Sequence, residues 1–135
     1  MVEKYLNVDT RTLEESLSEV RKDANNIKTF SIMYLREHRA VLDEAIKIAF
    51  ERPEECTDPK EVLAAIPEAL LKDEYRKILA YVSKDGKKLA IVPHYLQEIF
   101  LGIPMEAVRN NPDAYEFVAE NALRKYPDIR LMARR

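Results

Sequence analysis

Apolar residues recur at helical spacing from Ile27 to Phe50, and this feature most limits how the chain can fold. Tyr34, Leu42 and Ile46 belong to this stripe, which is broad and widens toward its C-terminal end. A stripe this wide is typical of a helix that is covered on more than one side. The pattern predicts one helix over about 27–50 as the central element of a mainly helical domain.

A capping signal precedes this segment. Thr12 is followed three residues later by Glu15, and this spacing is that of a capping box, in which each side chain bonds the backbone of the other residue. Apolar residues at helical spacing follow the box. The sequence therefore predicts a first helix over about 13–25.

A second capping signal follows the long apolar stripe. Asp58 precedes Pro59, which suits the first turn of a helix because its missing N–H has no partner there. Pro67 lies too deep for the same helix to continue, because a proline inside a helix removes a hydrogen bond. We expect a short helix at 59–65 and a new helix from residue 67.

The segment near 78–92 has two interpretations. Apolar residues from Leu71 to Val82 keep helical spacing, and Gly86 follows them as a residue that could end a helix. The alternative is a β-hairpin that turns at Asp85-Gly86. The longer periodic window favours the helix.

Three further helices are expected toward the C-terminus, over about 94–101, over 104–110, and from an Asn111 cap up to Pro127. No internal repeat, low-complexity segment or long linker stands out. The sequence thus predicts a mainly α protein with a single compact domain of six to seven helices over 1–135.

Composition narrows the class of protein. No apolar run approaches the ~20 residues of a membrane-spanning helix, and the N-terminus lacks the pattern of a secretory signal. Cys56 is the only cysteine, which suits a reducing compartment and excludes an internal disulfide. We expect a cytoplasmic protein. Its richness in Glu, Lys and Arg is a bias found in thermophiles.

Charge is distributed unevenly along the chain. Residues 1–75 contain 11 Lys and Arg against 17 Asp and Glu, a net charge of −6, and residues 76–135 contain 11 against 7, a net charge of +4. The acidic N-terminal part and the basic C-terminal part could bind different partners or attract each other.

Residues that could support catalysis or metal binding are sparse. Neither glycine belongs to a phosphate-binding loop, and no nucleophile elbow or zinc-protease motif occurs. His94 and Glu98 could share a helix face, but they provide only two ligands. His38 is expected to be half-buried beside a local partner. The sequence therefore predicts a non-enzymatic protein with no cofactor and no metal.

In the segment 94–111, Gly102 lies between two expected short helices, next to the apolar residues Leu101 and Ile103 and six residues before Val108. This arrangement resembles the helix-turn-helix of DNA-binding proteins, which turns at the position of Gly102 and has apolar residues at the other three positions. Glu98 departs from the pattern, which prefers a small residue there. The resemblance implies that the second helix could enter a DNA groove, and the alternative is an ordinary corner between two helices.

Two functions follow from these observations. The first is a helical adaptor or assembly subunit that acts through protein partners or self-association. The second is a nucleic-acid-binding protein whose C-terminal part contacts phosphates, with no role at a membrane. The cations expected to make those contacts are Lys84, Lys87, Lys88, Arg109, Arg124, Lys125, Arg130, Arg134 and Arg135.

Overall fold

The computed structural model describes residues 11–133 and is built from helices. Within that range it contains nine α-helices, several short 3-10 helices and no strand. The mainly helical prediction is confirmed. Internal contacts group the chain into two compact units that divide between residues 70 and 71.

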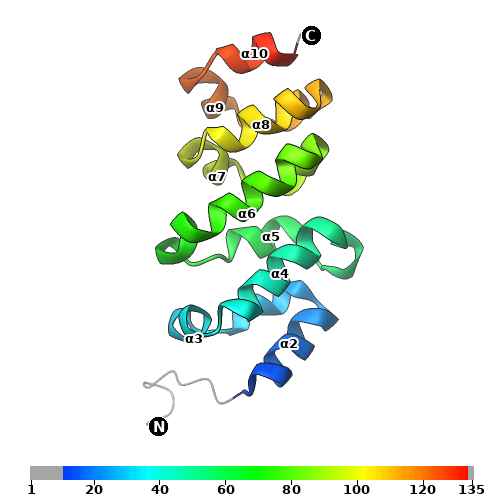
Figure 1. The fold of residues 1–135 in the computed structure, drawn as a ribbon, viewed down its shortest axis with the longest axis vertical. Helices are drawn as coiled ribbons and strands as arrows, with labels where there is room; N and C mark the ends of the chain where they lie inside the picture. Colours follow the sequence, from blue (N-terminus) through cyan, green and yellow to red (C-terminus); the bar gives the residue numbers. More distant parts are fainter. Residues whose placement is uncertain (1–10, 134–135) are drawn as a thin grey trace. The chain divides into compact units, whose positions relative to one another are not determined.

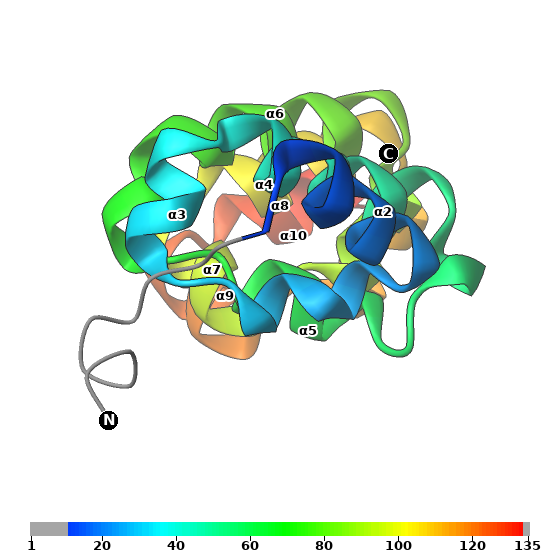
Figure 2. The ribbon, with the colours of Figure 1, turned by 90° about the horizontal axis from the view of Figure 1, so that it is seen from below.

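Unit 1 contains two longer helices and several short segments. In chain order they are α2 (Leu13–Lys22), the 3-10 helix η1 (Ala24–Thr29), α3 (Ile32–Glu37), α4 (Arg39–Glu51), η2 (Pro53–Glu55), α5 (Pro59–Ala64) and η3 (Glu68–Leu70). Helix α2 packs on α4, while η1 and α5 run beside each other and both contact α4 (Figure 2).

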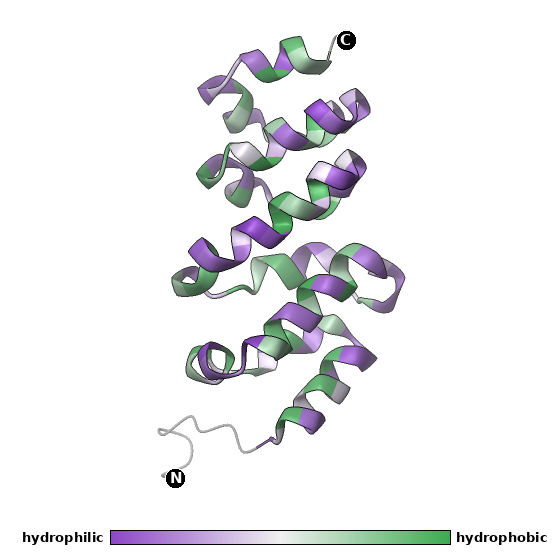
Figure 3. Ribbon diagram, viewed as in Figure 1, coloured by the Kyte–Doolittle hydropathy of each residue, from purple (hydrophilic) through white to green (hydrophobic). Residues whose placement is uncertain are grey.

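Unit 2 contains two longer helices, α6 and α8, and several short segments. Its elements are α6 (Leu71–Lys84), η4 (Gly86–Ile91), α7 (His94–Ile99), α8 (Gly102–Asn110), η5 (Pro112–Phe117), α9 (Glu120–Lys125) and α10 (Asp128–Ala133). The helices α6, α8 and α10 pack side by side in chain order (Figure 1), and η4 packs on η5. Hydrophilic and hydrophobic residues alternate along α6 and α8 (Figure 3), as expected of helices covered on one side.

The capping box that begins α2 is confirmed. The Glu15 N–H donates to the Thr12 hydroxyl oxygen at 3.1 Å, and the Thr12 N–H donates to the Glu15 carboxylate at 2.8 Å. The hydrogen bond from the Thr12 backbone N–H to the Glu15 carboxylate lowers the pKa of Glu15, and the Thr12 side chain lowers it further. The helix ends at Lys22, three residues before the predicted end, because the Asp23 side chain caps the next element.

The prediction of one helix over 27–50 is wrong. That segment contains the end of η1, the short helix α3 and the helix α4. Ser31 caps α3 by accepting from the Tyr34 N–H, and His38 breaks the path with φ −124° and ψ 65°. The apolar stripe is broad because several short elements bury it from different directions, and not because a single helix is surrounded.

One backbone path occurs three times in the described residues. It begins with an Asp or Asn in extended conformation and continues through a six-residue 3-10 helix and two extended residues. A six-residue α-helix and a residue near φ −125°, ψ 75° complete it. We call this the cap-turn-helix motif. Its copies are Asp23–His38, Asp85–Phe100 and Asn111–Tyr126.

The same side-chain roles recur in each copy. The cap side chain accepts the N–H two residues later, at 2.9 Å in Asp23, 3.2 Å in Asp85 and 3.0 Å in Asn111. A ring ends every copy. Equivalent buried positions hold Phe30, Val92 and Val118, then Tyr34, Leu96 and Ala122, and the final rings are His38, Phe100 and Tyr126. The sequence analysis found no repeat, because what recurs is residue class at fixed spacing and not residue identity.

A fourth segment begins the motif without completing it. Asp58 is extended and accepts the Lys60 N–H at 3.1 Å, as the predicted cap should. The next six residues form the α-helix α5, which matches the predicted helix within one residue. Pro67 then precedes η3, so the helix expected from residue 67 begins instead as α6 at Leu71.

Gly86 shows why the predicted hairpin does not form. It begins η4 directly after the Asp85 cap, so 78–92 is a helix followed by a 3-10 turn. A Cβ atom on Gly86 would lie 2.1 Å from the Ala107 carbonyl oxygen in α8. The glycine is needed for this close approach, and not as the left-handed end of a helix.

The prediction of one helix from the Asn111 cap up to Pro127 is also wrong. Asn111 and Pro112 do begin an element, but it is the 3-10 helix η5, and Val118 and Ala119 are extended before α9 begins. The short-helix predictions at 94–101 and 104–110 correspond to α7 and α8, with shifted ends.

Side-chain amides join successive segments within each unit. In unit 1 the Asn25 amide donates to the Asp58 carbonyl and accepts from the Asp58 N–H, both at 2.9 Å. In unit 2 Asn110 accepts from the Gly86 N–H at 2.8 Å. Buried Gln97 donates to the Phe117 carbonyl at 3.0 Å and accepts the N–H of Ala119 at 2.7 Å. These bonds satisfy backbone groups where one motif meets the next.

Candidate functional site

The predicted basic residues lie on five elements of unit 2. Lys84 ends α6, Lys87 and Lys88 lie in η4, Arg109 in α8, Arg124 and Lys125 in α9, and Arg130 in α10. All are exposed except Lys88, which is half-buried. Arg134 and Arg135 lie outside the described residues.

Some of these basic residues are brought together at a joint, by which we mean the contact between the end of α8 and residues 84–86. The Asn110 amide donates to the Lys84 carbonyl at 3.4 Å and accepts from the Gly86 N–H. The end of α8, with Arg109, therefore lies against the chain that carries Lys84 and Lys87. Nothing in the described contacts joins Arg124 or Arg130 to this joint.

Acids in the same helices pair with two of the cations. Arg109 contacts Glu106 one turn earlier, and Arg124 lies 3.0 Å from Glu120. Exposed pairs of this kind contribute little to stability, but they reduce the positive potential around each guanidinium. The basic surplus of unit 2 is thus partly neutralised where it was expected to bind phosphates.

The helix pair that resembles a helix-turn-helix has a different turn. Gly102 does not have the positive φ expected of the turn residue, and it begins α8 with nothing near its Cβ position. Pro104 is buried within α8. The side chain of Asn110, the last residue of α8, accepts a hydrogen bond from the Gly86 N–H. This geometry is that of a helix corner, and nucleic-acid binding remains a prediction.

The titratable residues have structural neighbours. The ring of His38 lies 4.4 Å from that of Tyr34, which confirms a half-buried histidine with a local partner. Burial raises the pKa of the Cys56 thiol, and the nearby Asp23 carboxylate adds to this effect. A thiol with a raised pKa is a poor nucleophile at neutral pH. Among residues 11–133, no three His, Cys, Asp or Glu side chains form a group that could hold a metal ion.

Exposed apolar side chains form a feature that sequence periodicity missed. Met33 in α3 and Tyr95 in α7 occupy equivalent positions of the motif, and they are 71% and 41% exposed. Ile32 and Ile99 on the same two helices are also exposed. The sequence assigned α3 to a buried stripe, so the outward direction of Ile32 and Met33 could not be predicted before the break at His38 was known.

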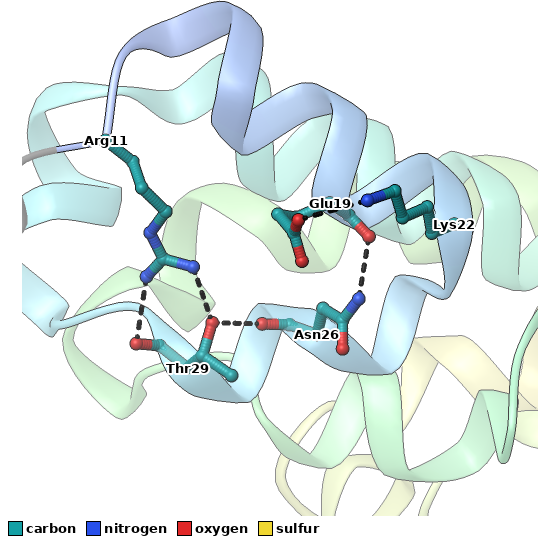
Figure 4. Close-up of polar contacts among 5 residues, drawn as sticks. All are labelled: Arg11, Glu19, Lys22, Asn26 and Thr29. Atoms are coloured by element: carbon teal, nitrogen blue, oxygen red, sulfur yellow. Dashed lines mark hydrogen bonds and ion pairs between the residues drawn. The ribbon is translucent and has the colours of Figure 1, made fainter.

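Helix α2 borders a shallow open groove. Its volume is about 360 Å³, and it is lined by Arg11, Glu14, Glu15, Ser18 and Glu19. Arg11 donates to the Thr29 hydroxyl at 2.9 Å and to its carbonyl at 3.1 Å, while Asn26 donates to the Glu19 carbonyl at 2.8 Å (Figure 4). These bonds fix the wall between α2 and η1 and leave acidic side chains along the groove.

No family model, curated protein or solved structure matches this chain. Function is therefore argued from the residues alone. None of the helices in residues 11–133 is long and apolar enough to cross a membrane.

Proposed function

We propose that this protein is a non-enzymatic helical adaptor that binds protein partners through the short α-helices of its motifs. The observation that carries the proposal is the exposure of Met33 and Tyr95 at equivalent motif positions. Large apolar side chains held outward on packed elements are suited to enter a pocket on a partner.

The motif supports this role because its α-helix is buried on one side and exposed on the other. In α3 and α7 one side of the helix is anchored by buried Tyr34 and Leu96. Met33 and Tyr95 are exposed on the same two helices. Helical arrays often bind proteins in this way, because the buried residues fix the backbone and the outer residues are free to vary.

The polar side chains most suggestive of chemistry have structural roles in the same motifs. Gln97 is fully buried and bonded to two carbonyls and one N–H, and Asn25 holds the Asp58 backbone. Asp23 accepts from Thr57 and Asn25. These partners favour a scaffold over a catalytic site, because groups used for proton transfer need access to a substrate.

Site-specific photo-crosslinking tests the proposal. A photoreactive residue is placed at Met33 or Tyr95, and matched controls are placed at exposed Lys47 in α4 and Lys72 in α6. The expected result is one dominant crosslinked protein from Met33 or Tyr95 and none from the controls, and Met33→Ser with Tyr95→Ser should abolish its binding. Equal crosslinking from all four positions would contradict the proposal.

The nucleic-acid alternative is tested in parallel. Binding of a mixed-sequence duplex and of a single strand is measured by fluorescence anisotropy at about 50 mM salt, where contacts to phosphates are strongest. If Lys84, Lys87 and Arg109 contact phosphates, replacing all three by Ala should weaken binding to every sequence alike. The adaptor proposal expects no binding to either probe.

A further inference from the structure

We draw no further inference here: the strongest candidate, the exposed surface patch that Ile99 of α7 forms with the neighbouring helix α9 in unit 2, carries no proposal because Glu98 and Glu120 offset Arg124 and Lys125 there and nothing in the structure shows what covers it.

Discussion

An asparagine holds a joint in each unit, but the two amides act in opposite directions along the chain. In unit 1 Asn25 belongs to the earlier segment and holds the backbone of the later cap, Asp58. In unit 2 Asn110 immediately precedes the later cap and holds the backbone of the earlier segment at Gly86. The joint therefore requires a side-chain amide at a particular position between the two segments. Either of the two neighbouring segments can contribute this amide.

The two joints also differ in how closely the chains approach. Unit 2 brings Gly86 so near to α8 that no side chain fits, whereas unit 1 has fully buried Ala24 at the equivalent position. The unit 1 cap Asp23 instead accepts the backbone N–H and the hydroxyl of Thr57. One joint depends on shape and the other on polar groups, and substitutions can separate these two contributions.

The largest expected effect is that of Gly86→Ala. The new methyl would collide with the Ala107 carbonyl in α8, so the substitution should cost about 3 kcal/mol, at the upper end for overpacking. Gly102→Ala is the control, since nothing lies near its Cβ position, and it should change stability by less than about 1 kcal/mol, in the stabilising direction. Urea unfolding followed by circular dichroism measures both. Similar stability of the two variants would mean that the unit 2 joint does not depend on close approach.

Gln97→Leu should have the next largest effect. Leu35 and Leu123 occupy the equivalent motif positions, so leucine suits the helix, but the substitution leaves the Phe117 carbonyl and the Ala119 N–H without this partner. Unpaired buried groups should make the cost about 2 kcal/mol. The loss should appear in chemical unfolding and as faster amide exchange at Ala119. A variant as stable as the parent would show that the amide is dispensable there.

Replacing the two asparagines compares the joints directly. Asn25→Ala removes two 2.9 Å bonds at a buried site, and it should cost about 2 kcal/mol. Asn110 is exposed, so water can replace its bonds, and Asn110→Ala should cost less than about 1 kcal/mol. The free energies of unfolding decide the order. If Asn110→Ala were the more damaging, solvent exposure would not be what distinguishes the joints.

The smallest effect concerns pH at the unit 1 joint. Burial alone would raise the pKa of Asp23, but hydrogen bonds from Thr57 and Asn25 outweigh it, so the pKa is lowered in the folded protein. A lowered folded pKa stabilises the protein above the unfolded value of about 3.9, and this stabilisation is lost as pH falls through the folded pKa. Asp23→Asn keeps the cap type found in the third motif. Its stability deficit should therefore shrink below about pH 3.9. A deficit that stays constant from pH 7 into this range would show that the charge has no part in it.

The sequence predicted starts of elements better than their continuity. Thr12, Asp58 and Asn111 all cap elements, because a cap depends on residues within one turn. The stripes over 27–50 and after Asn111 were read as single helices, because apolar spacing near 3.6 survives when a 3-10 helix and a short α-helix follow each other. Breaks such as His38 have no strong local signal.

The candidate site was less predictable than the fold. Arg109 and Arg124 were identified as exposed cations, but their pairing with Glu106 and Glu120 depends on helix positions that the sequence left uncertain. The exposure of Met33 required knowing which neighbours cover α3. The role of Gln97 could not be predicted from the sequence, because a buried amide is recognised only when the carbonyls it satisfies are known.

The hydrogen bonds described above between successive segments each close a short stretch of chain. The longest separation among them is 34 residues, between Asp23 and Thr57, and the bond of Gln97 to Phe117 spans 20. Proteins dominated by such local contacts fold quickly, since little chain entropy is lost before a contact forms. On a ribosome the bonds from Asp23 and Asn25 can form once Asp58 has emerged, before unit 2 has been synthesised. The order of synthesis and the order of assembly therefore run in the same direction along this chain.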